Sequence, residues 1–389
     1  MTRFFHAMGS GLDDHRPWTI TAMVCTIVLL LTGHALLYSA TSVSDATAFG
    51  TPWRTVTIHF LQSLAGLVLL TALFLMPLSK LRRLVPYLLL AAVAASLLLF
   101  LPFTGVKSGG AVRHVALGFL RWEPGQVLAV TLILWSALVF SRRPLGSRRR
   151  MISLFIVGLA LVIAILQPDF SLVALILVPI AGQSLVAGLR LPRAARLALG
   201  MGVLILILAA LHPYITRRVD GWRHTQATLY DAGYDYVLLQ RGVSSGGAWG
   251  KGLGQGEHIR KTGVAKSDYL VAHAFEELGV FRALLLLALY LPIFLLGLRA
   301  ARIHRRSFLG LTGVGMAGYI LTAATIHTAV SLRIIPVTAI HMPFLSYGGS
   351  SLIMSMAALG LLISVNRVPA GKGPEDTASE RVAEEAGPV

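Results

Sequence analysis

The chain has 389 residues, of which 55% are hydrophobic and 13% are charged, and its mean hydropathy is +0.73. This composition excludes an ordinary soluble domain. The net charge of +17 does not indicate nucleic-acid binding, because the Lys and Arg residues are scattered over short loops and are not gathered on one face. The single cysteine, Cys25, excludes disulfides within the chain.

Apolar segments long enough to cross a bilayer follow one another along the chain. A hydrocarbon core of about 30 Å needs roughly 20 apolar residues per helix. Ten segments approach or reach this length, at residues 18–40, 55–76, 84–103, 125–141, 151–166, 170–188, 197–215, 271–298, 308–332 and 346–366. We therefore predict an all-α, polytopic integral membrane protein with ten transmembrane helices. One transmembrane domain covers residues 1–368, and residues 369–389, rich in Pro, Gly, Ala and Glu, form a disordered cytoplasmic tail.

The placement of Lys and Arg predicts the orientation. With the N-terminus in the cytoplasm, the inner segments carry 20 of these residues and the short outer loops carry 5, as the positive-inside rule requires. Both termini are then cytoplasmic. One long outer loop, at about 216–270, carries eight more, which indicates that something anionic is held there.

The approach to the fourth segment, residues 112–126, contains Arg113 and Arg121 on either side of a short apolar stretch. Arginine and tryptophan are ordinary residues at a membrane interface. A pair of guanidinium groups near an outer cavity is also suited to a diphosphate. Both interpretations stay open.

The long outer loop contains a glycine-rich stretch at residues 246–256, with Lys251 in its middle. It is not a P-loop or a dinucleotide fingerprint, because the Gly-Lys-Ser/Thr ending and the preceding strand are missing. Glycine lets backbone amides approach a ligand closely. The stretch is therefore either a phosphate cradle or a flexible surface loop.

Acidic residues mark the start of the eighth segment. Asp268 stands directly before it, where a carboxylate can cap a helix; the alternative is a general base or an electrostatic stabiliser, kept ionised by nearby basic residues. Glu276 and Glu277 lie inside the segment. An ionisable group in a membrane helix is a functional candidate by default, and a buried ion pair with an arginine is the alternative.

The run from His341 to Ser351 precedes the last segment and combines a proline, aromatics, adjacent glycines and hydroxyls. Irregular backbone at this depth is tolerated only where protein or a polar cavity surrounds it. The run, with Ser346 and Tyr347 at its centre, is therefore an internal site or a tight packing node. The histidines of the outer region show no zinc spacing, so no metal site is assigned to them.

Six elements of the sequence occur in the order and spacing of one known family. They are Leu37–Ser42, similar to its YSAS element; Arg113–Gln126, similar to its RWI and QPSE elements; Gln167-Pro168-Asp169, its QPD; Gly233–Gly247, similar to GYxxxQS and SGG; Asp268–Gly279, similar to DFIFAVIxEELG; and Pro336–Ser351, similar to PVTGIPLPFxSYGGSS. Together they resemble the SEDS family (shape, elongation, division and sporulation proteins) over nearly the whole chain.

The resemblance implies a ten-helix peptidoglycan glycosyltransferase that polymerises lipid II at the outer face of the bacterial cytoplasmic (inner) membrane, for cell shape or cell division, with a class B penicillin-binding transpeptidase as partner. Asp268 takes the position of the family's essential aspartate, and a carboxylate can accept the proton of an attacking sugar hydroxyl. Cations would stabilise the lipid diphosphate that leaves: Arg113, Arg218 and Lys251, or a bound Mg²⁺ or Mn²⁺. The further substrate-binding candidates are Glu276, Glu277, Ser346 and Tyr347.

The chain departs from the family pattern before the fourth segment. Glu123 and Gln126 exchange the amide and acid positions of QPSE, and Ala129 stands where the family has a lysine. These changes keep a second interpretation open, a catalytically silent scaffold of a cell-wall complex. A third, a flippase of a lipid-linked precursor, usually brings inverted repeats, which the sequence does not show.

Overall fold

The computed structural model describes residues 15–100, 105–108, 111–117, 120–141, 158, 170–189, 213–225, 233–262 and 264–369. The predicted segments at 151–166 and 197–215 lie outside these residues except for Gly158 and residues 213–215, and the Gln167-Pro168-Asp169 element and the tail from residue 370 lie outside them completely. The helices are α2 (His15–Phe49), α3 (Arg54–Leu75), α4 (Leu78–Leu97), α5 (Pro124–Ser141), α7 (Phe170–Val186), α9 (Pro213–Arg223), α10 (Tyr234–Gly246), α11 (Leu270–Ala288), α12 (Leu291–Ile303), α13 (Phe308–Ser331) and α14 (Gly349–Asn366), with the short 3₁₀ turns η1 (Leu98–Phe100) and η2 (Ile259–Thr262).

The predicted all-α membrane class is confirmed. Within the described residues, 7 helical spans are long and apolar enough to cross a membrane, α11 and α12 together forming one of them, and α7 is a shorter apolar helix. All eight predicted segments that fall on described residues are helical.

A small sheet was not predicted. The strands β1 (Gly105–Ser108), β2 (Ala111–Leu117) and β3 (Leu120–Trp122) form an antiparallel sheet in the order β1-β2-β3. Ser108 pairs with Ala111, and the two residues between them are Gly109 and Gly110. A Gly-Gly pair between two short strands is a hairpin signal, but the sequence analysis treated this region only as a loop that leads to the fourth segment.

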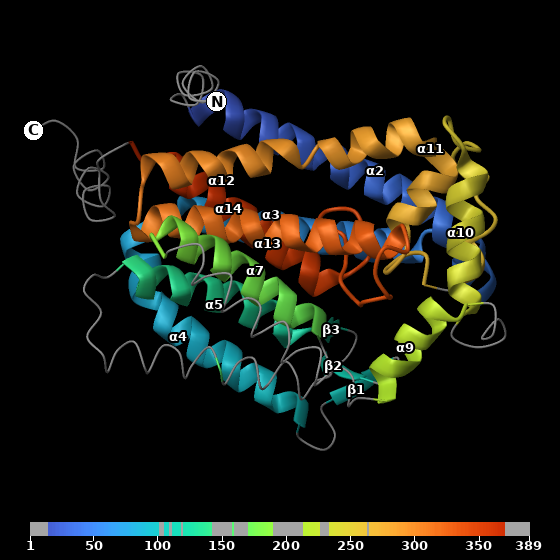
Figure 1. Ribbon diagram of the computed structural model, residues 1–389, viewed down its shortest axis with the longest axis horizontal. Helices are drawn as coiled ribbons and strands as arrows, with labels where there is room; N and C mark the ends of the chain where they lie inside the picture. Colours follow the sequence, from blue (N-terminus) through green and yellow to red (C-terminus); the bar gives the residue numbers. More distant parts are fainter. Residues whose placement is uncertain are drawn as a thin grey trace, which may run out of the picture.

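The helices form a bundle with a buried centre (Figure 1). The spans of α5, α13 and α14 are mostly buried, whereas no more than a third of the residues are buried in the most apolar part of α2, α3, α4 and the α11–α12 span. Exposed side chains such as Leu31, Val68, Leu90 and Leu285 are stable on an outer surface only if lipid covers them. The outer helices are therefore the lipid-facing layer.

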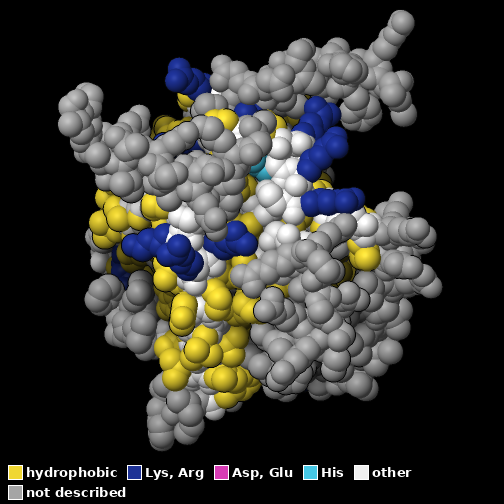
Figure 2. Space-filling model, turned by 90° about the vertical axis from the view of Figure 1, so that its left-hand side faces the viewer, with side chains coloured by type: hydrophobic (Ala, Val, Ile, Leu, Met, Phe, Trp, Pro, Cys, Tyr) yellow, Lys and Arg dark blue, Asp and Glu magenta, His cyan; other side chains and the backbone are white. Residues whose placement is uncertain are grey.

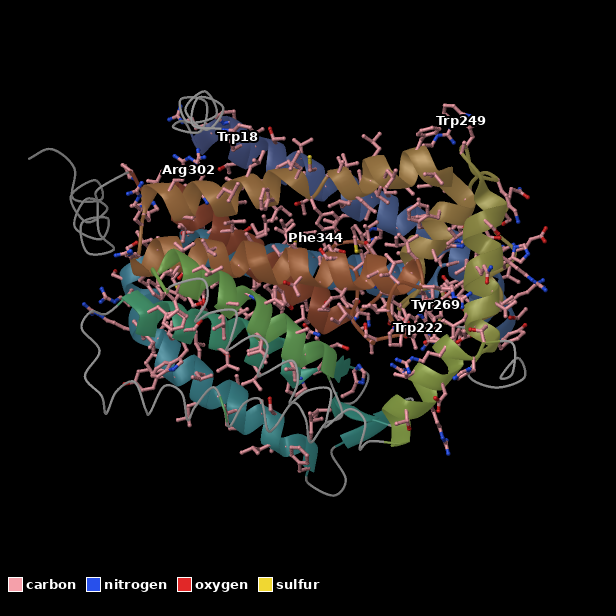
Figure 3. The ribbon with its side chains drawn as sticks, in the orientation of Figure 1. Trp18, Trp222, Trp249, Tyr269, Arg302 and Phe344 are labelled. Atoms are coloured by element: carbon pink, nitrogen blue, oxygen red, sulfur yellow. The ribbon has the colours of Figure 1, made fainter. Side chains whose placement is uncertain are left out.

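The two ends of the bundle differ in charge. At one end α2 begins, α14 ends and α12 is connected to α13 (Figure 1). Arg302 lies in the last turn of α12, and Arg305 and Arg306 lie in the connection. Lys and Arg side chains gather on the described surface of this end (Figure 2). The small sheet, α9 and α10 lie at the opposite end, where Trp222, Trp249 and Tyr269 are also found (Figure 3). That opposite end is called the outer end below.

Helix α2 runs further than the predicted 18–40. Its 35 residues correspond to about 52 Å, more than a hydrocarbon core of about 30 Å. In the additional turns, Asp45 accepts hydrogen bonds from the backbone N–H (2.8 Å) and the hydroxyl (3.1 Å) of Thr55. A side chain of α2 thus satisfies a free donor in the first turn of α3, which fixes the connection between the two helices.

Helix α11 is broken at Gly279, whose φ of 78° and ψ of 173° are not helical. Such a break frees backbone groups that must find partners at membrane depth. The glycine-rich stretch after α10 supplies them on both sides of the break. The bonds are Lys251 N–H to Glu276 O (3.1 Å), Gly252 N–H to Glu277 O (2.9 Å), Val280 N–H to Gly247 O (3.0 Å) and Phe281 N–H to Ala248 O (3.3 Å).

Glycines allow this close approach. A Cβ on Gly250 would overlap the carbonyl oxygen of Glu277, and a Cβ on Gly279 would overlap the backbone nitrogen of Gly250. Both residues also have positive φ, at 82° and 78°. The loop and the broken helix therefore form one interlocked unit, which we call the stitched loop (residues 246–259 with the break in α11).

We expect Gly250→Ala to lower the free energy of unfolding by about 3 kcal/mol or more, because the new methyl group meets a backbone that cannot withdraw. Gly254→Ala is the matched control. Gly254 has the same φ of 82°, but nothing lies within 4 Å of an added Cβ, so its cost is about 1–2 kcal/mol. Thermal unfolding of both variants in detergent micelles measures the difference. Equal shifts would contradict the interlocked packing.

Candidate functional site

Asp268 lies at the outer end, in the turn directly before α11, and is half-buried. Its backbone N–H donates to Val264 O (3.0 Å), which closes this turn. The carbonyl oxygen of Lys266 accepts from Tyr347 N–H (2.9 Å), and the Lys266 ammonium lies 5.3 Å from the centre of the Tyr347 ring. The structure thus brings two predicted elements, the one around Asp268 and the one around Tyr347, into contact.

Ser346 is buried and closes a turn of its own. Its hydroxyl oxygen accepts from Met342 N–H (2.7 Å) and its hydroxyl donates to Met342 O (3.3 Å). A Cβ on Gly348, two residues later, would overlap the ring of His341, and a Cβ on Gly349 would overlap the side-chain amide of Gln62. The contacts of this run are those of a packing node, and a direct contact of Ser346 with substrate stays a prediction.

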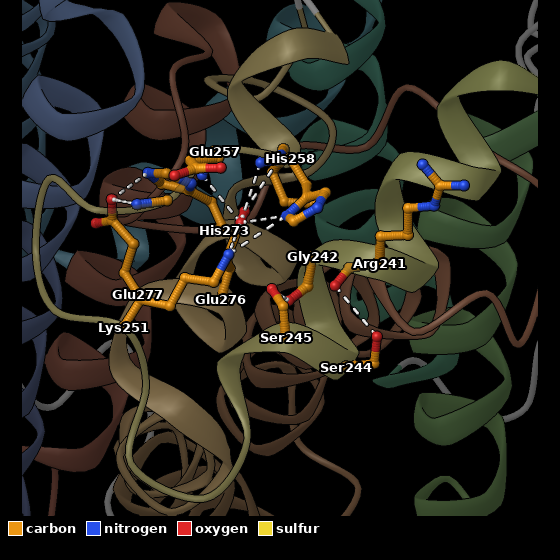
Figure 4. Close-up of polar contacts among 12 residues, drawn as sticks. Arg241, Gly242, Ser244, Ser245, Lys251, Glu257, His258, His273, Glu276 and Glu277 are labelled. Atoms are coloured by element: carbon orange, nitrogen blue, oxygen red, sulfur yellow. Dashed lines mark hydrogen bonds and ion pairs between the residues drawn. The ribbon is translucent and has the colours of Figure 1, made fainter.

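Glu276 and Glu277 are both fully buried, and their carboxylates are surrounded by donors from the stitched loop (Figure 4). The donors to Glu276 are the backbone N–H groups of Glu257 (2.9 Å), His258 (3.0 Å) and Ile259 (3.1 Å), with His258 Nδ1 at 2.9 Å and Lys251 Nζ at 3.3 Å. The donors to Glu277 are the N–H groups of Gly254 and Gly256, each at 3.0 Å, and the Ser39 hydroxyl at 2.5 Å, with His273 Nε2 at 3.3 Å.

These contacts decide between the alternatives for the glycine-rich stretch. It is not a flexible loop, and the amides that a phosphate would need already donate to two carboxylates. The partners of Glu276 are backbone amides, a histidine and Lys251, and not the arginine of the buried ion pair considered above. We assign Glu276, Glu277 and Lys251 a positioning role, since both carboxylates are fully buried and each is bonded to the loop. Glu277 Oε2 has no hydrogen-bond partner among the described residues.

Arg218 joins three segments of the outer end. Its guanidinium donates to Val337 O (3.1 Å), and its carbonyl oxygen accepts from the Tyr236 hydroxyl (3.3 Å). The same hydroxyl accepts from Val337 N–H (2.9 Å). Arg218 on α9 and Tyr236 on α10 are thereby fixed to the segment that leads to α14.

One buried apolar cluster at the outer end holds the site together. We call it the tyrosine cluster; its buried members are Tyr236, Leu239, Ile259, Ala265, Tyr269, Ala272 and Val330. Burial raises the pKa of the Tyr269 hydroxyl, the carboxylates of Asp235 and Asp268 raise it further, and Arg218 lowers it. Asp268 and Arg218, which are 50 residues apart in the numbering of the chain, therefore act on the same ring.

Asp235 is the residue of this site that the sequence analysis missed. It lies in the first turn of α10 and is half-buried, and burial raises its pKa. The signal was a carboxylate directly after the Gly233-Tyr234 pair, inside an element already used for the family resemblance.

The remaining predicted positions lie at or beside the outer end. Arg113 is in β2, and its side chain lies outside the described part of the structure. The exchanged residues Glu123 and Gln126 are buried and bonded to each other, with Gln126 Nε2 donating to Glu123 Oε2 (3.2 Å). The Tyr319 hydroxyl donates to Gln126 (2.7 Å). The chain therefore keeps one acid and one amide at these two positions, in contact with each other, although the two residue types are exchanged relative to the QPSE pattern.

Among the described residues, no group of three or more His, Cys, Asp or Glu side chains could hold a metal ion. The predicted Mg²⁺ or Mn²⁺ stays a prediction for the complex with a diphosphate substrate, and no step described below depends on it.

We expect Glu276→Gln to destabilise the outer end by about 2–4 kcal/mol, because a carboxamide replaces one acceptor oxygen by an NH₂ group that faces existing donors. Glu257→Gln, on an exposed side chain of the same loop, is the control and is expected to change little. Limited proteolysis of the loop and thermal unfolding measure the two variants. Unchanged protection of the loop in Glu276→Gln would refute the positioning role.

Several known proteins resemble this chain along almost its whole length. FtsW of Coxiella burnetii, named a probable peptidoglycan glycosyltransferase, is 28% identical over 360 residues, covering 90% of this chain and 96% of that protein. FtsW of Nitrosococcus halophilus, which has the same name, is 29% identical over 380 residues, covering 94% and 96%.

Solved structures show the same fold. RodA, the rod shape determining protein of Thermus thermophilus, is similar with a TM-score of 0.66 at 21% identity, covering 90% of this chain and 97% of that chain. A chain of a peptidoglycan synthase complex that coordinates polymerization and crosslinking is similar with a TM-score of 0.71 at 22% identity, covering 89% and 96%. The family model of FtsW, RodA and SpoVE, described as cell cycle protein, matches residues 20–370. This chain is a member of the SEDS family.

Proposed function

We propose that this protein is a peptidoglycan glycosyltransferase that polymerises lipid II at the outer face of the bacterial cytoplasmic membrane. The observation that carries the proposal is the half-buried Asp268 at the outer end, beside the tyrosine cluster and in contact with the segment of Tyr347 through Lys266. The names of the FtsW relatives support the same reaction.

In this reaction a sugar hydroxyl attacks the anomeric carbon of a second sugar that is linked to a lipid diphosphate. Asp268 accepts the hydroxyl proton as the new C–O bond forms and the bond to the diphosphate breaks. A single displacement inverts the anomeric carbon. The leaving diphosphate carries the developing negative charge, and Arg218, with Arg113 on the neighbouring sheet, is the cationic group proposed to stabilise it.

The orientation follows from charge. The end with Arg302, Arg305 and Arg306 faces the cytoplasm under the positive-inside rule, so that both termini are cytoplasmic and Asp268 lies outside. A class B penicillin-binding transpeptidase is the proposed partner, which the similarity to a chain of a peptidoglycan synthase complex supports.

A catalytically silent scaffold is the second candidate function. Ala129, where the family has a lysine, and the exchange of Glu123 and Gln126 favour it. The buried contact of Glu123 with Gln126 speaks against it, because the start of α5 keeps an acid and an amide bonded to each other.

We expect Asp268→Asn to reduce polymerisation by about 100-fold or more, because an amide cannot accept the proton. Purified protein is reconstituted with lipid II, a divalent cation and its transpeptidase partner, and glycan polymer is separated on a gel. Asp220→Asn, an exposed residue of α9, is the control and should polymerise as the wild type does.

Normal polymer from Asp268→Asn would sink the assigned mechanism. No polymer from a folded wild-type complex would favour the scaffold.

A further inference from the structure

We propose that Asp235 is a second substrate-binding carboxylate of this site, which accepts a hydrogen bond from a hydroxyl or amide N–H of the acceptor sugar beside the base Asp268. The inference rests on the proposed glycosyltransferase function and deepens it. Four observations support it: the shared tyrosine cluster, the exposure of Asp235, its lack of an internal partner and the charges around it.

The tyrosine cluster brings the two aspartates to one place. Asp235 is followed directly by Tyr236, and Asp268 is followed directly by Tyr269. Both tyrosines are almost completely buried, each 1% exposed, in the same cluster. Each aspartate therefore adjoins a ring of this cluster and lies at its edge. The cluster brings them together from α10 and from the turn before α11, which are separate in the sequence.

The helix geometry of α10 leaves Asp235 at the edge of this cluster. Successive residues of an α-helix are turned by about 100°. Tyr236 points into the cluster, Tyr234 is 47% exposed, and Asp235 between them is half-buried. Its carboxylate is therefore neither in bulk solvent nor inside the packed core.

Asp235 makes no hydrogen bond or ion pair within the described part of the chain. Three other acidic side chains are used internally: Asp45 binds Thr55, and Glu276 and Glu277 bind the stitched loop. A carboxylate that loses part of its water without gaining a partner is costly. A donor from outside the chain would offset this cost, and a sugar offers several hydroxyls.

The surrounding charges agree with this position. The pKa of Tyr269 is raised by burial and also by Asp235 and Asp268, and that of Tyr236 is raised by burial and by Asp235 and is lowered by Arg218 and Arg333. Two carboxylates and two guanidinium groups therefore lie around the two rings. The Arg333 guanidinium lies 5.7 Å from the centre of the Tyr236 ring, and that of Arg218 donates to Val337 O. The carboxylates are suited to the hydroxyls of a sugar and the guanidinium groups to a diphosphate.

We assign Asp235 to the acceptor sugar, whose hydroxyl attacks, for a geometric reason. The attacking hydroxyl has to reach Asp268 within hydrogen-bond distance. A second carboxylate at the edge of the same cluster can fix another group of that sugar and so orient the attack. Asp235 takes no proton in this scheme, and Asp268 alone acts as the base.

Binding is measured with fluorescent lipid II in the Asp268→Asn background, where no turnover interferes, and with the double variant Asp268→Asn/Asp235→Asn. We expect the double variant to bind about tenfold more weakly, the size of one charge-assisted hydrogen bond. In the otherwise wild-type protein, Asp235→Asn should raise KM about tenfold while kcat stays within about threefold. Asp235→Glu should recover part of the loss, and Asp220→Asn is the matched control.

Each outcome decides one question. If the wild-type protein polymerises lipid II and the Asp235→Asn variants have the same KM and Kd as their parent proteins, the inference is overturned and the proposed function stays intact. A loss of kcat without a change in Kd assigns Asp235 to the chemical step and likewise overturns it. Absence of wild-type turnover contradicts the proposed function, and the Kd comparison still decides whether Asp235 binds the sugar. Thermal unfolding of the Asp235→Asn variant confirms that it is folded.

Discussion

The break in α11 at Gly279 and its repair by the glycine-rich stretch are the constraint on which the outer end depends. A broken helix at membrane depth leaves donors and acceptors that lipid cannot satisfy. Here the main chain of residues 247–252 pairs with both sides of the break, and the two glutamates just before it bind the amides that follow. Backbone and side chains of one helix therefore hold the same loop at two places.

The repair extends to the proposed base, Asp268, through a short series of contacts. Ile259 N–H donates to Glu276, and the Ile259 side chain is buried in the tyrosine cluster. Tyr269 lies in that cluster, directly after Asp268. The position of the proposed base is thus tied to contacts that belong to the loop and to α11. The YSAS element takes part as well, since Ser39 of α2 donates to Glu277.

The sequence was sufficient for the membrane class, because apolar segments of the required length are a strong and local signal. It was also sufficient to place Asp268 at the start of α11. It could not give the role of Glu276 and Glu277, since their partners lie 17–23 residues earlier in the chain and are mostly backbone amides, which no residue type reveals. The sheet was missed although Gly109-Gly110 marks its hairpin, because the region was interpreted as an approach to a helix. Asp235 was passed over because its significance comes from a cluster that only the folded chain assembles.

The stitched loop also bears on how α11 enters the membrane. Two adjacent acidic residues oppose the insertion of a helix into lipid, and an unpaired carboxylate is costly there. All their backbone N–H donors lie in residues 254–259, which precede α11 in the chain and are therefore synthesised first. Insertion of this helix is in this way coupled to folding of the stitched loop, because the loop supplies the amides that bind the two carboxylates.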